Sequence, residues 1–191
     1  YDFLGVAPIF SKEGDQQDLS KVPAKLLRAI ESDEEMDGVV TDRQRFRVLP
    51  YSKEEVEKID NLFTKAGRTT QVLLYTDASE ASFKQSASMA RYLHLATHSF
   101  SHAGDPLRSG IAFAQPDPED ATEDGILYLS EISDLEIQPE LVVLSSCEGN
   151  SGPLLKGEGI ASLARAFTQA GSPRTISALW SVYDTYTNSL M

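Results

Sequence analysis

One cysteine and three histidines are the residues of this chain that pair most readily as a nucleophile and a base. Cys147 ends the apolar run ELVVLSSC and His98 follows the run YLHLAT, so each is predicted at the carboxyl end of a buried strand. A thiol with a pKa of about 8.5 is a good nucleophile once it is partly ionised. If the two strands are neighbours, the thiolate can attack a carbonyl while the imidazole handles the proton of the leaving amine.

This pair needs few other side chains. The backbone N–H groups of Cys147 and Ser99 can stabilise the oxyanion of such a reaction whatever their side chains are. The alternative is that Cys147 is a small buried apolar residue, as free cysteines often are. Its place at a strand end, before a glycine-containing loop, favours the reactive interpretation.

The three histidines are spaced four residues apart, at His94, His98 and His102. On a helix they would share one face and suit zinc. However, YLHLAT is apolar all round, and the segment after it contains Gly104 and Pro106, which indicate a loop. No acidic residue within YLHLATHSFSH is available to orient a ligand. We therefore predict no metal, with His94 hydrogen-bonded in the core, His98 at the strand end and His102 in solvent.

The elements that must position these residues alternate between strands and helices, which indicates an α/β sandwich with a mostly parallel sheet. Functional groups of such sheets lie beyond the carboxyl ends of the strands. Helices are predicted over 52–67, 78–90 and 157–171, and strands over 1–10, 69–76, 92–97, 110–117, 140–147 and 174–182, with a strand end and helical turns over 125–135.

Two of the predicted helices have recognisable starts. Ser52 and Glu55 form a capping box, and Ser79 is a possible N-cap. The predicted apolar face of the first helix consists of Val56, Ile59, Leu62, Phe63 and Ala66.

Composition excludes several classes of function. The formal charge of -12 argues against a nucleic-acid binder, which needs basic surface to displace counterions, and permits basic partners. No apolar run is long enough to span a membrane. A lone cysteine fits a reducing compartment, so we expect a cytoplasmic protein. We expect one domain over 1–191 with an acidic surface insertion at 11–44. A start without Met suggests a piece of a longer protein.

Four segments in order carry a resemblance to a known family: YLHLATHS, LVVLSSCEGNSG, GEGIASLARAFTQAGS and ISALWSVYD. They resemble the CHAT domain, a caspase-like peptidase domain often fused to TPR repeats in bacteria and related to caspases, separase and gingipains. The resemblance covers Arg45 to Met191. It implies a caspase-like three-layer α/β/α sandwich and a cysteine protease that acts without a cofactor on a protein or peptide substrate.

By this resemblance His98 and Cys147 take the positions of the catalytic dyad. Asp184 matches an Asp that in separase-like relatives lines the pocket for a basic P1 residue, and a carboxylate there would bind Arg or Lys through charge-assisted hydrogen bonds. An N-cap role for Asp184 remains equally open. Ser99 departs from the family, which usually has Gly after the histidine. The resemblance also implies regulation by a linked sensor domain such as TPR repeats.

Two other functions stay open. CEGNSGPLLKGEGI lies between a strand and a helix, as phosphate-binding loops do, but it contains neither GxxxxGK[ST] nor a complete GxGxxG. The chain is alternatively an inert caspase-like scaffold, an interpretation that Ser99 supports and that the retained His98 and Cys147 oppose.

Overall fold

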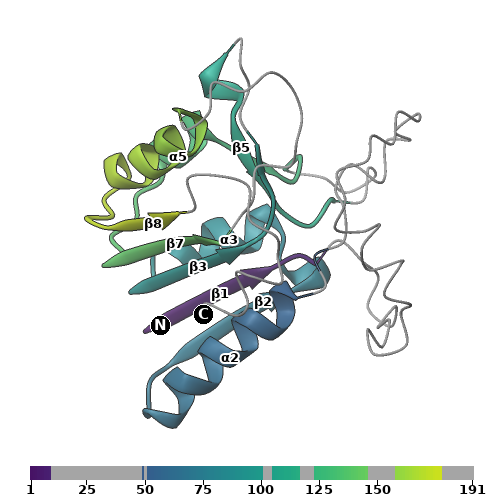
Figure 1. Ribbon diagram of the computed structural model, residues 1–191, viewed down its shortest axis with the longest axis vertical. Coiled ribbons are helices and arrows are strands. Elements are labelled where there is room, and N and C mark those ends of the chain that lie inside the picture. The colour runs from purple at the N-terminus through teal and green to yellow at the C-terminus, as the bar shows by residue number, and fades with distance from the viewer. Residues whose placement is uncertain (10–48, 50, 101–104, 117–122, 146–157, 178–191) are drawn as a thin grey trace.

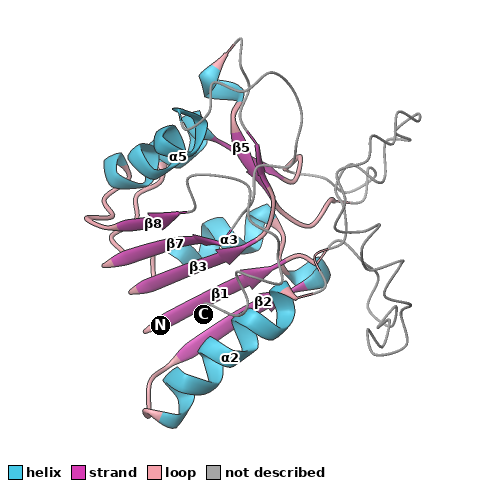
Figure 2. Ribbon diagram, in the orientation of Figure 1, coloured by secondary structure: helices cyan, strands magenta, loops and turns pink. Residues whose placement is uncertain are grey.

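The computed structural model contains a five-stranded sheet, all of it parallel, in the order β2-β1-β3-β7-β8 (Figures 1 and 2). The structure describes residues 1–9, 49, 51–100, 105–116, 123–145 and 158–177. The strands of this sheet are β1 (Phe3–Ala7), β2 (Thr70–Leu74), β3 (Tyr92–Ala96), β7 (Leu141–Ser145) and β8 (Thr175–Ser177). The predicted parallel α/β class is confirmed.

A second, antiparallel sheet with the order β4-β5-β6 continues from the end of β3. Its strands are β4 (Ser99–Phe100), β5 (Gly110–Ala112) and β6 (Ile126–Tyr128). The helices are α2 (Ser52–Lys65), α3 (Glu80–Ala87), α4 (Leu129–Asp134) and α5 (Glu158–Gln169), with 3₁₀ turns η2 (Tyr75–Asp77) and η3 (Pro106–Arg108).

Helices cover both faces of the parallel sheet. Strand residues alternate between the faces, so Phe3 and Ala7 of β1 pack with Val56 of α2, while Leu4 and Val6 pack in the other core. That larger core also holds buried side chains of α3, α4 and α5, among them Phe83, Ile132, Leu163 and Phe167. The result is the predicted three-layer sandwich, with α2 in front of the sheet in Figure 1.

The predicted capping box at the start of α2 is wrong. The N-cap is Tyr51, which makes no side-chain capping bond, and the Ser52 hydroxyl instead donates to the Leu49 carbonyl at 2.8 Å. Glu55 is fully buried and its carboxylate contacts His94 of β3 at 2.6 Å. Glu55 therefore pairs with a histidine in the core and not with the backbone at the start of its own helix. The Ser79 N-cap of α3 is confirmed, because its side chain accepts from the Ser82 N–H.

Three apolar positions are more exposed than predicted, namely Leu62 of α2, Ala66 at the C-cap of α2 and Ile176 of β8. Leu62 is 62% exposed, because α2 buries Val56 and packs Ile59 and Phe63 against the sheet, and Leu62 lies to one side of that stripe. Ile176 is 54% exposed, since β8 pairs only with β7 within the described residues. The described part of the predicted buried strand 174–182 is thus an edge strand.

Other predictions concern segments beyond the described residues. The acidic surface insertion predicted at 11–44 lies outside the described residues. Among the helices that the structure describes, none combines the length and apolar character required to cross a membrane.

Candidate active site

The strands that precede His98 and Cys147 are hydrogen-bonded neighbours. β3 and β7 pair in parallel, with Tyr92 opposite Leu141 and Ala96 opposite Ser145, so both strands end at the same level of the same sheet edge. His98 follows Ala96 by two residues. Cys147 follows Ser145 by two residues and lies outside the described residues, as do His102 and Asp184. The condition that the sequence left open, that these two strands are adjacent, is therefore met.

His98 lies at the junction of the two sheets. It is half-buried, and its carbonyl accepts a hydrogen bond from the Ala112 N–H of β5 at 2.9 Å. The preceding residue, Thr97, is buried, and its hydroxyl donates to the carbonyl of the same Ala112 at 2.5 Å. The His98 backbone is thus attached to β5 on both sides of its Cα atom.

Ser99 begins β4 and is buried opposite Ile111. The non-glycine residues with positive φ in the described part are Ile9 and Tyr75, so Ser99 does not need the backbone freedom of glycine. The Ala112 N–H donates to the His98 carbonyl, so His98 and Ala112 form a hydrogen-bonded pair of the antiparallel ladder. The next pair, Ser99 and Ile111, is therefore a non-hydrogen-bonded pair, and its N–H groups point away from the partner strand. A serine at this position therefore causes no backbone strain.

His94 is the core histidine that the sequence predicts. Its side chain is 3% exposed, and its Nε2 atom lies 2.6 Å from Oε1 of the fully buried Glu55. This partner was not predicted from the sequence, because Glu55 lies 39 residues away from His94 along the chain. The available signal was a glutamate beside Val56, on the face of α2 that meets the sheet. The strand conformation of 92–96 also excludes the helical arrangement on which the zinc alternative depended.

A cluster of carboxylates on the other face of the sheet was also missed. Glu80, Glu123 and Glu131 converge within 4.8 Å of one another, and the Lys84 ammonium lies 2.7, 3.1 and 2.8 Å from them. Burial raises the pKa of Glu80 to about 7, and Lys84 partly opposes this shift. The Lys84 ammonium thus already gives these carboxylate oxygens the positive charge that a bound metal ion would otherwise supply. The four residues are too scattered in sequence for a spacing rule to find them.

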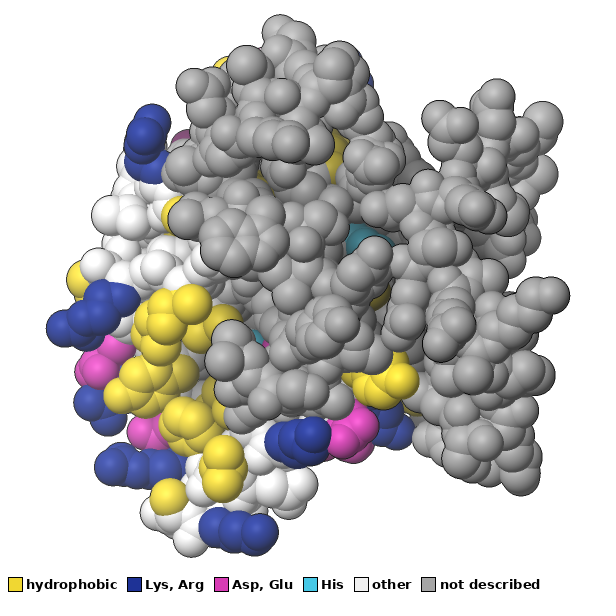
Figure 3. Space-filling view, viewed as in Figure 1, with side chains coloured by type: hydrophobic (Ala, Val, Ile, Leu, Met, Phe, Trp, Pro, Cys, Tyr) yellow, Lys and Arg dark blue, Asp and Glu magenta, His cyan; other side chains and the backbone are white. Residues whose placement is uncertain are grey.

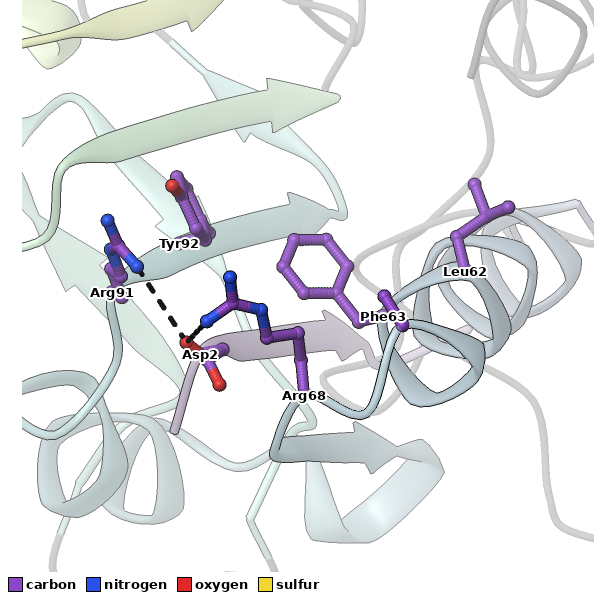
Figure 4. Close-up of a pocket in the computed structure, with 7 residues that line it drawn as sticks. Asp2, Leu62, Phe63, Arg68, Arg91 and Tyr92 are labelled. Carbon is purple, nitrogen blue, oxygen red and sulfur yellow. Dashed lines mark ion pairs between the residues drawn. The ribbon is translucent and has the colours of Figure 1, made fainter.

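A surface pocket of about 320 Å³ lies at the opposite, amino-terminal edge of the sheet. In Figure 4 Arg68 and Arg91 approach Asp2, with distances of 3.6 and 4.0 Å to Asp2 Oδ1. Figure 3 shows hydrophobic side chains gathered on this face, with Lys and Arg side chains around them. The lining residues are Asp2, Leu62, Phe63, Ala66, Arg68, Arg91 and Tyr92. Since Tyr92 begins β3 and His98 follows its end, this pocket is not part of the candidate active site.

Comparison with known proteins identifies a family and a relative. The family described as "CHAT domain" matches residues 9–191, nearly the whole chain. A human protein, tetratricopeptide repeat protein 28, is 25% identical over 185 residues, which cover 82% of this chain and 7% of that protein. The chain thus spans a small part of the length of this relative.

Proposed function

The chain belongs to the CHAT domain family of the caspase-like peptidase clan, and on this premise we propose that it is a cysteine endopeptidase with His98 and Cys147 as its catalytic dyad. One observation carries the proposal, namely that β3 and β7 are parallel neighbours whose last paired residues are Ala96 and Ser145. Each dyad residue follows its strand by two positions, and two residues of chain reach at most about 7 Å. Both side chains thus start from adjacent strand ends.

The proposed reaction is acyl transfer. The Cys147 thiolate attacks the scissile carbonyl carbon, and the electron pair of the C=O bond moves to the oxygen. Backbone N–H groups of Ser99 and Cys147 donate to this oxyanion. The carbonyl bond then re-forms and the C–N bond breaks. The amine leaves with a proton from the His98 imidazolium, and the acyl group stays on Cys147 as a thioester. Water, deprotonated by His98, then attacks the thioester carbon and releases the acid and the thiolate.

The proposed substrate is a protein segment with Arg or Lys at P1. Its motivation is the position of Asp184 in the motif shared with separase-like relatives, because a carboxylate in the P1 pocket would bind a guanidinium or ammonium group. The formal charge of -12 favours the approach of basic segments. We further propose control of the enzyme by a linked sensor domain. The relative named for its tetratricopeptide repeats makes such repeats the first candidate.

Cleavage of a peptide library, with products identified by mass spectrometry, tests the proposal. We expect cleavage after Arg and Lys by the wild type and none by Cys147→Ala or His98→Ala. Asp184→Asn should weaken the preference for basic P1 residues and leave the dyad intact. Cleavage that survives Cys147→Ala would refute the mechanism, whereas a dominant apolar P1 residue would refute the substrate class alone.

The second candidate function is that of an inert scaffold. It rests on Ser99 replacing the family glycine, yet the extended backbone of Ser99 in β4 removes the conformational reason for a glycine there.

Thermal stabilisation by ATP or NAD, with no response to peptides, would instead favour the nucleotide-binding alternative.

A further inference from the structure

Thr97, which no reaction step uses, holds the backbone beside His98 through its side chain. Thr97 and His98 are the two residues between β3 and β4, and they connect the parallel sheet to the antiparallel one. Both bond to Ala112, Thr97 through its hydroxyl to the carbonyl at 2.5 Å and His98 through its carbonyl to the N–H at 2.9 Å. These two hydrogen bonds hold the backbone on both sides of the His98 Cα atom and so fix where its side chain begins.

Ala112 is a firm anchor because it lies inside a strand. It is fully buried in β5, opposite Ile126 of β6. Beyond it, the Ala114 N–H donates to the Ala78 carbonyl at 2.9 Å, next to the start of α3. The Gly125 N–H donates to the buried Glu80 carboxylate of α3 at 3.1 Å. The two-point attachment of residues 97 and 98 is therefore tied to a helix that packs in the main core.

We propose that Thr97 is a positioning residue, whose hydroxyl orients His98 toward the end of β7; as a statement about catalysis, this rests on the proposed function. Thr97 is 1% exposed, so solvent offers its hydroxyl no competing partner. Valine has nearly the same shape but cannot donate, and the Ala112 carbonyl then loses this donor. A catalytic group displaced by about 1 Å costs roughly 100-fold in rate.

Four variants separate the hydroxyl from side-chain size. Thr97→Val and Thr97→Ala remove the donor, whereas Thr97→Ser keeps it and lacks only the methyl group. Thr175→Val is the matched control, because the Thr175 hydroxyl is buried and has no hydrogen-bond partner in the described part of the chain. If Thr97→Val does not fold, the comparison of Ser with Ala, which also differ by one hydroxyl, carries the test.

Two readouts keep this inference apart from the proposed function. Ring-proton NMR is practicable because the chain has three histidines, each assignable by single substitution. We expect Val and Ala at position 97 to shift the His98 resonance and leave that of His94 in place, and we expect Ser to retain the wild-type spectrum. The second readout is the rate at which an Arg-based electrophilic peptide labels Cys147. It should fall about 10- to 100-fold in Val and Ala, with unchanged probe affinity, and recover in Ser.

The outcomes are distinct. A His98 resonance and a labelling rate that match the wild type in Thr97→Val and Thr97→Ala would overturn the role of Thr97. An equal effect of Thr175→Val would overturn it too, since the change would not be specific to the attachment. If Cys147 is never labelled, the proposed function fails, and the NMR comparison still decides whether Thr97 orients His98.

Discussion

Replacing Glu55 by alanine should destabilise the fold by about 3–5 kcal/mol, because it removes one partner of a buried polar pair. Glu55 is fully buried, the side chain of His94 is 3% exposed, and their atoms lie 2.6 Å apart. The variant leaves the imidazole without its carboxylate in a place that water does not reach. Domains are stable by about 5–15 kcal/mol, so a large fraction of the total is lost.

Denaturant unfolding followed by circular dichroism measures this change. Glu54→Ala is the matched control, since Glu54 is one residue away in α2, half-exposed and paired with Lys58 at the surface. Its cost should stay below about 1 kcal/mol. Replacing both Glu55 and His94 by leucine should recover much of the loss, because apolar groups can replace a buried pair. A Glu55→Ala variant within about 1 kcal/mol of the wild type would refute this explanation.

Three further predictions concern the packing around the sheet. Lys84→Met leaves the buried Glu80 without its cation and should cost about 3 kcal/mol in denaturant unfolding; a loss below about 1 kcal/mol would contradict the role of the ammonium. Since burial raises the pKa of Glu80 to about 7, the folded state takes up a proton between pH 7 and 4.5 before the unfolded state does. The unfolding free energy of the wild type relative to Glu80→Gln should therefore rise as the pH falls through this window, and a difference that falls would count against the shift. Gly5→Ala places a methyl group against Val56 Cγ1 and should cost about 1–3 kcal/mol; Val56→Ala in the same chain should relieve part of that cost, and strictly additive losses would exclude the clash.

Patterns of apolar residues were sufficient to predict the class of fold. The continuous apolar runs around Leu93 and Val142 predicted buried parallel strands, and both strands are present. Strand order could not be predicted in this way, because the pairing of β3 with β7 depends on how whole helices and strands pack, and no local sequence pattern specifies it. That pairing is nevertheless what brings the segments before His98 and Cys147 together.

Local rules failed where a distant partner competed for the same side chain. Glu55 has the spacing of a capping box, yet its carboxylate contacts the ring of a histidine 39 residues away in the core. The Lys84 cluster likewise joins residues from α3, α4 and the turn before β6, so only the fold reveals it. In the candidate site, His98 follows a strand end as predicted, whereas its attachment to Ala112 has no signal in the sequence. The roles of Cys147 and Asp184 stay predictions.

The most direct test of the dyad is to map the covalent adduct of a Lys- or Arg-based electrophilic peptide by mass spectrometry on the intact protein and its fragments. The account predicts one adduct, on Cys147, which disappears in Cys147→Ala and whose formation slows strongly in His98→Ala but not in His94→Gln variants that remain folded. An adduct on Cys147 that forms at the same rate without the His98 imidazole would contradict the pairing of the two residues.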